Sequence, residues 1–292
     1  MSKHDQLSLP VQQFLADLAE SQGHLRPEEV QFIPIGKVEW GFEFPRLHGE
    51  LTEQLWNLEE TEVSATQYQK TLRSLLKQEP ELFDAANDLA NFYFENEKHD
   101  QAQKIYERYV ELAKSYIPPK FVQGKHHIIW AYMDNRPFLR LLAGYAQFIE
   151  ATTKVSRAIP LYEEILAFNP NDNQGIRAIL ATAYLKTNKL VEVSELAAHY
   201  ADEILPELVM GNVLALFKLG KISEAKKFLE CNLEYQRHVI KEILSENHSI
   251  PATLCEGTVT VGGEDEAYYY WDAQGSLWDA AHGAKDFLRQ HS

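Results

Sequence analysis

The feature that most constrains this fold is a recurring pattern of small residues in four helix-like segments. Each segment has the periodicity of two amphipathic helices joined by a short turn, with a small or β-branched residue where the second helix would cross the first. These crossing positions are Ala102, Ala158, Val193 and Ala225, separated by 56, 35 and 32 residues. Small side chains at a crossing let two helix backbones approach closely. Self-similarity at such a period predicts stacked helix pairs.

The pattern resembles the tetratricopeptide repeat (TPR), whose period is about 34 residues. The stretch "SATQYQKTLRSLLKQEP" precedes the first segment and resembles a further half repeat. The resemblance implies an all-α protein, a right-handed TPR-like α-solenoid with a small β-containing N-terminal segment and a helical C-terminal cap. The apolar or small positions that carry it are Leu89, Ala90, Tyr93, Tyr106 and Tyr109, then Tyr145, Ala146, Ile149, Tyr162, Ile165 and Pro170, then Leu180, Ala181, Tyr184, Ala197 and Tyr200, then Val213, Leu216, Gly220 and Leu229.

We expect three parts along the chain. Residues 1–60 form an N-terminal segment with a candidate β-hairpin, 61–240 hold the TPR-like repeats with an insertion at 117–138, and 241–292 form a capping segment. The late stretch "EAYYYWDAQGSLW" could be an aromatic ligand box. The interpretation we prefer is that its aromatic residues cover the last repeat, because the ends of a solenoid need a cap.

Two motifs narrow the resemblance. "W..MDNRPFLR" in the insertion and "NPNDNQGIR" at 169–177, together with the late aromatic stretch, resemble a group of bacterial TPR proteins of unassigned function, and "NPNDNQGIR" is also similar to the repeat region of the suppression-of-tumorigenicity family. We expect Pro170 to close one helix, 171–173 to supply turn and cap oxygens, and 174–177 to begin the next helix. Gly175 would either permit close helix packing or leave room for a ligand.

The N-terminal "KVEWGFEFP" alternates the apolar residues Val38, Trp40, Phe42 and Phe44 with polar residues or glycine. Period two predicts a half-buried strand, and a lone strand needs a partner. "VQFIPI" could complete a hairpin, and "GTVTVGG" at 257–263 could add a third strand. Strands exchanged between two protomers are the alternative, which makes a homodimer a candidate assembly.

The TPR resemblance also indicates which side chains face a groove. Two arginines near helix starts, Arg136 and Arg177, would suit a carboxylate or phosphate, or they could pair with Asp134, Asp172 or a carbonyl and only fasten the turns. A chaperone-tail carboxylate clamp is not expected, because most of its positions are unmatched. The candidate partner-binding groove consists of Asn87, Asn91, Phe94, Arg136, Arg140, Gln147, Arg177, Thr182 and Lys186.

Charge and hydropathy restrict the partners. A net charge of -15 and a pI near 5.2 oppose binding to nucleic acid, which needs a basic surface. No segment approaches the roughly 18 apolar residues of a membrane span. We therefore expect a soluble, cytoplasmic protein without a nucleic-acid or membrane partner. Cys231 and Cys255 stand far apart with no metal-binding spacing, and we expect both to be reduced, packed thiols.

No catalytic motif is present: we find no phosphate-binding glycine loop, no nucleophile elbow and no zinc-protease motif. We therefore predict no catalytic residue, no metal and no cofactor. The expected function is a non-catalytic scaffold that binds a protein or peptide of basic or mixed charge in the groove. The alternative is a small-anion or metal-dependent enzyme or binding protein that uses Arg136, Arg177 and the His126–His127 pair. Self-assembly alone is a third candidate.

Overall fold

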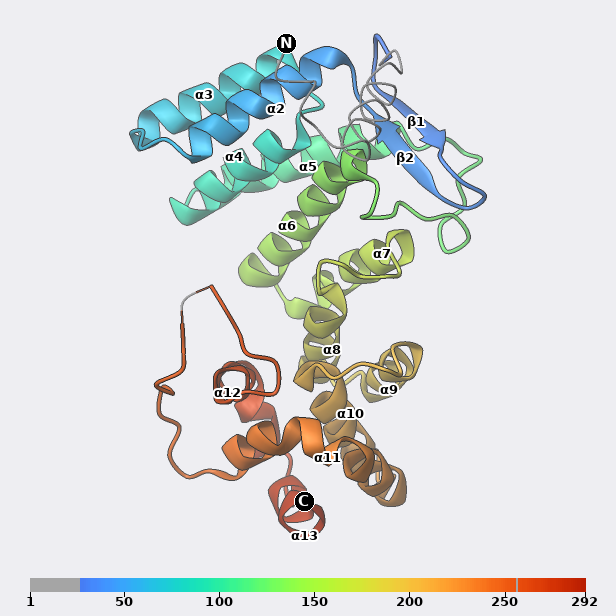
Figure 1. Ribbon diagram of the computed structural model, residues 1–292, viewed down its shortest axis with the longest axis vertical. Helices are drawn as coiled ribbons and strands as arrows, with labels where there is room; N and C mark the ends of the chain where they lie inside the picture. Colours follow the sequence, from blue (N-terminus) through green and yellow to red (C-terminus); the bar gives the residue numbers. More distant parts are fainter. Residues whose placement is uncertain (1–26, 256) are drawn as a thin grey trace, which may run out of the picture. The chain divides into compact units, whose positions relative to one another are not determined.

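The computed structural model describes residues 27–255 and 257–292. The chain divides into two compact units, one ending at Leu141 and the other comprising Leu142–Ser292 (Figure 1). This division falls within a helix and follows compactness, whereas the predicted bounds 1–60, 61–240 and 241–292 follow the repeat pattern and stay a prediction. None of the helices among the described residues is long and apolar enough to cross a membrane.

The first unit combines a β-hairpin with helices. Its elements are β1 (Gln31–Pro34), β2 (Trp40–Glu43), α2 (Arg46–Glu59), α3 (Ala65–Gln78), α4 (Phe83–Glu95), α5 (His99–Ser115), the short 3₁₀ helix η2 (Met133–Asn135) and the beginning of α6 (Arg136–Thr152). The second unit continues α6 with η3 (Val155–Arg157), α7 (Ile159–Phe168), α8 (Ile176–Lys186), α9 (Leu190–His199), α10 (Pro206–Lys218), α11 (Ile222–Leu244), α12 (Glu264–Ala280) and α13 (Ala284–His291).

The predicted repeats correspond to the helix pairs α4/α5, α6/α7, α8/α9 and α10/α11, and α3 supplies the half repeat. The crossing residues Ala102, Ala158, Val193 and Ala225 are all buried. Side chains between crossings fill the core, and Tyr162 of α7 donates its hydroxyl to Glu150 of α6 at 2.7 Å. The fold class is therefore confirmed: an all-α, TPR-like solenoid with a short N-terminal β-segment.

Three of the helix pairs share the same turn. A residue with positive φ follows the first helix of the pair, at Glu97 (58°), Asn188 (58°) and Gly220 (73°). The next residue is a lysine in each turn. Its amide donates to the carbonyl oxygen five residues earlier, that of Tyr93, Tyr184 or Leu216. This is the Schellman ending, in which a left-handed residue lets the chain reverse while the last helical carbonyls stay bonded.

The N-terminal hairpin is confirmed. β1 and β2 pair antiparallel, with Phe32 opposite Phe42 and Pro34 opposite Trp40. Trp40, Phe42 and Phe44 are buried, as the alternation predicts. The prediction of a third strand is wrong, because residues 257–263 form only an isolated bridge between Thr258 and Cys255. Two glycines with positive φ interrupt that segment, which explains why it does not stay extended.

A buried carboxamide attaches the hairpin to the insertion. Asn135 is fully buried, and its Nδ2 donates to the carbonyl oxygens of Trp40 and Ile129, both at 3.0 Å. Its Oδ1 accepts from the amide of Phe42 at 3.0 Å. α6 begins at Arg136, directly after this asparagine, as expected for an arginine near a helix start. The asparagine does more than cap, because it satisfies backbone groups of a strand more than ninety residues away.

The C-terminal helices pack on the repeats. α12 contacts α11 and also reaches α10 and α8, while α13 packs on α11 and α12. Tyr270 and Trp278 are buried, and the indole N–H of Trp278 donates to the Tyr270 hydroxyl at 2.9 Å. This favours the packing interpretation of the aromatic stretch over a ligand box. α12 covers more than the last repeat, because α8, which it also contacts, belongs to the preceding repeat.

The prediction of packed thiols is wrong. Cys231 and Cys255 are both free and exposed. Cys231 lies on the outward side of α11 between two exposed or half-exposed neighbours, and Cys255 lies in the long connection between α11 and α12. Neither position belongs to a helix-crossing face, so the repeat pattern does not bury them.

The shared turn gives the first prediction. Replacing Glu97 by glycine removes the steric penalty of a left-handed residue that carries a Cβ, and we expect a gain of about 0.5–1 kcal/mol in the free energy of unfolding. Urea unfolding followed by far-UV circular dichroism measures it. The same change two residues earlier, Glu95→Gly, falls on the last residue of α4 and should instead destabilise by up to about 1 kcal/mol. A loss of stability in Glu97→Gly would contradict the turn assignment.

The buried carboxamide gives the second prediction. Asn135→Ala leaves two carbonyl groups and one amide of the hairpin and insertion without partners, so we expect a loss of about 2–4 kcal/mol in the free energy of unfolding. Urea unfolding measures the loss. Asn57→Ala, on the exposed side of α2, is the matched control and should change stability by less than about 0.5 kcal/mol. Equal effects of the two substitutions would show that Asn135 is not the attachment point.

Candidate functional site

Three of the predicted groove residues line one cleft in the first unit. Asn87, Arg136 and Arg140 border a space of about 570 Å³ enclosed by α2, α4, η2 and the beginning of α6. We call it the α2/α4/α6 cleft. Asn87 comes from the first helix of one repeat and both arginines from the first helix of the next. These three residues therefore lie on one concave surface.

Polar groups on the walls of this cleft are held in fixed positions. Arg140 binds Asp84 with two parallel contacts, Nε to Oδ1 at 2.8 Å and Nη2 to Oδ2 at 2.5 Å. Arg136 donates through Nε to the carbonyl oxygen of Trp130 at 3.0 Å. Both guanidinium groups also lie over the Trp130 ring, at 5.2 and 5.7 Å from its centre. Bidentate pairing and ring contact leave little rotational freedom to either arginine.

Two exposed apolar side chains line the same cleft. Trp56 of α2 is 57% exposed and Met133 of η2 is 61% exposed, and both belong to the lining. Sequence reasoning missed α2 as a wall of the cleft. The signal was present, because Leu51, Leu55 and Leu58 recur at helical spacing and are buried, which leaves Trp56 on the open side.

The other two predicted groove residues of α4, Asn91 and Phe94, contact the second helix of their own repeat. The Tyr106 hydroxyl donates to Asn91 Oδ1 at 2.6 Å and lies 3.3 Å from Asn87 Oδ1. Burial raises the pKa of this hydroxyl, and the nearby Asp88 charge raises it further. Phe94 lies against the His99 ring, 5.4 Å between ring centres. Asn91 and Phe94 are half-buried, so each keeps one side towards the solvent.

In the second unit, two of the predicted groove residues contact side chains of the protein itself. Lys186 lies 3.8 Å from Glu150, and the Thr182 hydroxyl accepts a hydrogen bond from Gln274 Nε2 at 2.8 Å. Gln274 belongs to α12, so this helix covers part of the surface that the resemblance assigned to a groove. Gln147 is exposed. Arg136 and Arg177 belong to different units, and each has its own local partners.

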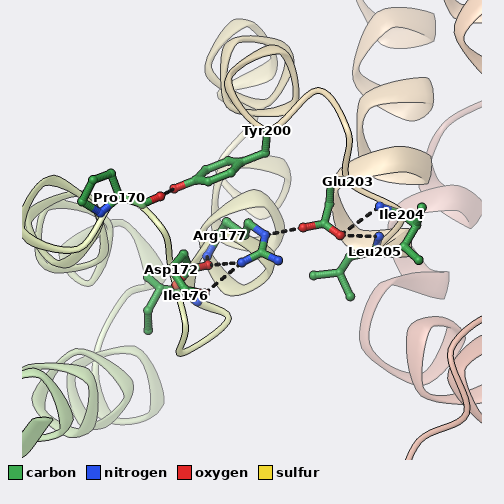
Figure 2. A network of polar contacts seen from close by, with 8 residues as sticks. All are labelled: Pro170, Asp172, Ile176, Arg177, Tyr200, Glu203, Ile204 and Leu205. Carbon is green, nitrogen blue, oxygen red and sulfur yellow. Dashed lines mark hydrogen bonds and ion pairs between the residues drawn. The ribbon is translucent and has the colours of Figure 1, made fainter. Parts of the chain in front are cut away.

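The "NPNDNQGIR" motif forms a polar joint between repeats (Figure 2). Asp172 has φ of 46°, and its two carboxylate oxygens accept from the amides of Ile176 and Arg177, both at 2.8 Å. α8 therefore begins at Ile176, two residues later than predicted. Gly175 has φ of 73°, and an added Cβ would meet no atom within 4 Å. Its role is conformational, so neither close packing nor ligand space explains it.

Arg177 is the centre of this joint. Its guanidinium donates to Asp172 Oδ2 and to the Asp172 carbonyl, both at 2.9 Å, and forms an ion pair with Glu203 (Figure 2). It also lies over the Tyr200 ring, whose hydroxyl donates to the Pro170 carbonyl at 2.9 Å. The guanidinium of Arg177 is thus already paired with two carboxylates. The geometry thus favours the fastening interpretation of Arg177 over anion binding.

Glu203 connects the joint to the start of the next repeat. Its Oε1 accepts from the amides of Ile204 and Leu205 at 2.9 and 3.1 Å, just before α10 begins. Burial opposes ionisation of Glu203, but the Ile204 amide, the Arg177 guanidinium and the Leu205 amide outweigh it and lower its pKa below the ordinary value. At Glu207, one turn later, burial raises the pKa more than a backbone amide hydrogen bond lowers it, and the Glu266 and Glu203 charges raise the pKa further.

The paired histidines have structural contacts. The Nδ1 atom of His126 accepts from the Val122 amide at 2.9 Å, and its ring lies 5.8 Å from the Trp40 ring. The carbonyl of His127 accepts from the Trp40 amide at 2.8 Å. They therefore join the insertion to the hairpin. Within residues 27–255 and 257–292 no group of three or more His, Cys, Asp or Glu side chains could hold a metal ion.

The lowered pKa of Glu203 gives the third prediction. A carboxyl whose folded pKa is depressed stabilises the protein above its ordinary pKa of about 4.5 and loses that contribution as pH falls through the folded value. Glu203→Gln should therefore lose about 1–3 kcal/mol of unfolding free energy at pH 7. The gap from wild type should narrow as the pH falls below about 4.5. Urea unfolding across pH 3.5–8 measures both.

Glu207→Gln is the matched control for that experiment. Because burial raises the pKa of Glu207, its ionised form disfavours folding at neutral pH, and its replacement should be neutral or stabilising there. A constant difference between Glu203→Gln and wild type over the whole pH range would contradict the role of the Glu203 charge.

Comparison with known proteins finds distant structural similarities. No protein-family model and no curated protein sequence matches the chain. Among solved structures it is similar to two crystal structures of nearly identical TPR-like repeats of a kinesin light chain-like protein from Podosopora anserina. One shares 17% identity over 66% of this chain and 94% of that chain, with a TM-score of 0.41. The other shares 16% identity over 72% and 95%, with a TM-score of 0.38. At such identities and scores these similarities say nothing about what the chain binds.

Proposed function

We propose that this protein is a non-catalytic interaction module that binds a peptide segment of a partner protein in the α2/α4/α6 cleft. The observation that carries the proposal is the pairing of exposed apolar side chains with fixed polar groups in one concave space. Trp56 and Met133 are both more than half exposed there. Arg140 and Asp84 are locked together beside them. Concave sites that combine apolar walls with a few oriented polar groups are the usual form of a binding site.

The apolar pair supplies the affinity in this proposal. Trp is the side chain most enriched among residues that dominate binding energy, since it buries a large area with little conformational freedom to lose. Met adapts its shape to different partners. A partner side chain that covers Trp56 and Met133 would remove apolar surface from water at about 25 cal/mol per Å².

The polar walls supply orientation. Asn87 presents a carboxamide that both donates and accepts, and it lies beside the bidentate pair of Asp84 and Arg140. Such groups can bond the backbone of an extended peptide. With a net charge of -15, the chain favours partners of basic or mixed charge through long-range attraction.

The alternative functions have less support. Anion binding by Arg177 would compete with two carboxylates already bound to it, and the paired histidines contact the hairpin. Self-assembly and a homodimer stay hypotheses. The finer resemblance of "NPNDNQGIR" to bacterial TPR proteins, and a cytoplasmic location, belong to the proposal as inferences from the sequence alone.

Trp56 and Met133 give the fourth prediction. The double variant Trp56→Gln, Met133→Gln removes the exposed apolar pair without disturbing buried contacts, so it should fold normally and lose partner binding. Affinity capture from the source lysate, followed by titration with the purified partner, should show about tenfold or greater weakening. Circular dichroism checks the fold.

A matched control uses apolar residues of similar exposure elsewhere. Tyr235 and Ile250 are 56% and 69% exposed and lie in the second unit, outside the cleft. The variant Tyr235→Gln, Ile250→Gln should keep the wild-type affinity. If the Trp56, Met133 variant binds the same partners as strongly as wild type, the proposed site is wrong.

A further inference from the structure

A second concave site in the first unit has an unusual charge. It is a space of about 350 Å³ between α3 and α5, and every charged residue that lines it is a cation. Arg73 and Lys77 come from α3, and Arg108 comes from α5. We call it the basic cleft. Acidic residues outnumber basic ones by 43 to 28 in this chain, so a cleft lined by three cations and no carboxylate runs against the overall composition.

The three cations have no ion-pair partner in the described part of the chain. Arg73 instead donates through Nε to the Tyr93 hydroxyl at 3.1 Å, and Arg108 lies over the Tyr109 ring at 5.4 Å. Several other exposed cations of the described helices have carboxylate partners, as in Lys226 with Glu230 and Arg289 with Asp286. Helix spacing normally offers such pairs at low cost.

Local helix chemistry explains only part of this arrangement. Lys77 lies in the last turn of α3, where the helix dipole favours a positive charge. Arg73 stands four residues earlier on the same face, and like charges at that spacing repel each other. Arg108 lies in the middle of α5, where no dipole effect operates. Arg73 and Lys77 therefore repel each other within α3, and an external anion would relieve that repulsion.

The floor of the basic cleft is apolar. Leu76, Leu89 and Tyr109 are buried beneath the cations, and Ile105 is half-buried. A small anion would find donors only at the rim, whereas a peptide could place an apolar side chain on Ile105 and carboxylates on the rim. The floor thus favours a peptide over a free ion.

We propose that the basic cleft binds an acidic peptide segment of a partner protein, in which carboxylates flank an apolar side chain. The carboxylates pair with Arg73, Lys77 and Arg108, and the apolar side chain packs on the floor. This site lies between second helices of the repeats, away from the α2/α4/α6 cleft, so it goes beyond the proposed function and does not depend on it. The molecule would then hold two segments of opposite charge preference.

The test uses a defined probe and the full chain. A fluorescein-labelled peptide of alternating Glu and Leu is titrated with the protein, and fluorescence anisotropy gives the affinity. A peptide with Gln at each Glu position is the neutral counterpart. We expect wild type to bind the acidic peptide at least about tenfold more tightly than the neutral one, with an affinity that falls as sodium chloride is added.

A charge-matched pair of variants locates the site. Lys77→Glu, Arg108→Glu reverses two cations of the cleft, while Lys70→Glu, Lys104→Glu makes the same charge change on the same two helices outside it. Arg73 is left intact because of its bond to Tyr93. The cleft variant should bind the acidic peptide at least about tenfold more weakly than wild type. The control variant should lose clearly less affinity than the cleft variant, because Lys70 and Lys104 do not line the cleft, although Lys104 lies one helical turn from Arg108.

Three results would overturn the proposal. One is no binding of the acidic peptide by wild type up to millimolar concentration. Another is equal weakening in the two double variants, which would indicate a general charge effect. The third is displacement of the peptide by inorganic phosphate at constant ionic strength, which would make the site a small-anion site. None of these results bears on binding through Trp56 and Met133, so the two proposals fail separately.

Discussion

Backbone groups that lie between helices must find hydrogen-bond partners, and in both units one buried polar side chain meets this requirement. Asn135 satisfies three groups of the hairpin and insertion in the first unit. Asp172 satisfies two amides of the repeat joint in the second unit, and Arg177 and Glu203 extend the chain of bonds to α10. A buried amide or carbonyl without a partner is costly. The positions of β2 and α6, and of α8 and α10, therefore depend on these few side chains.

The repeats could be predicted because their signal is local and recurs. Ala102 and its counterparts mark the crossings in the sequence and are buried in the structure. The partners of Asn135 could not be predicted, since Trp40 lies 95 residues away and an asparagine before a helix is explained well enough by capping. Glu203 was missed for the same reason: it lies 26 residues from Arg177, within a stretch that has no motif of its own.

The candidate groove residues lie in different surroundings in the two units. In each unit a helix outside the repeat pattern borders the surface formed by the first helices of the repeats. α2 borders the cleft with Asn87 and Arg140, and it leaves the space open. α12 contacts α8 and α10, and Gln274 takes the Thr182 hydroxyl. A resemblance to a repeat family carries no information on such added helices, so it cannot distinguish an open groove from one that the chain itself covers.

Electrostatics then separates the side chains that hold the fold from those available to a partner. Arg177 and Arg140 each bind carboxylates within their own unit, and removing a charge from such a pair leaves its partner buried or half-buried without compensation. These residues are constrained by stability, whatever surface they border. Lys77 and Arg108 are exposed and have no carboxylate partner in the described residues, so stability does not require them. In a chain of net charge -15, these cations are therefore the groups with which the proposed acidic peptide would pair.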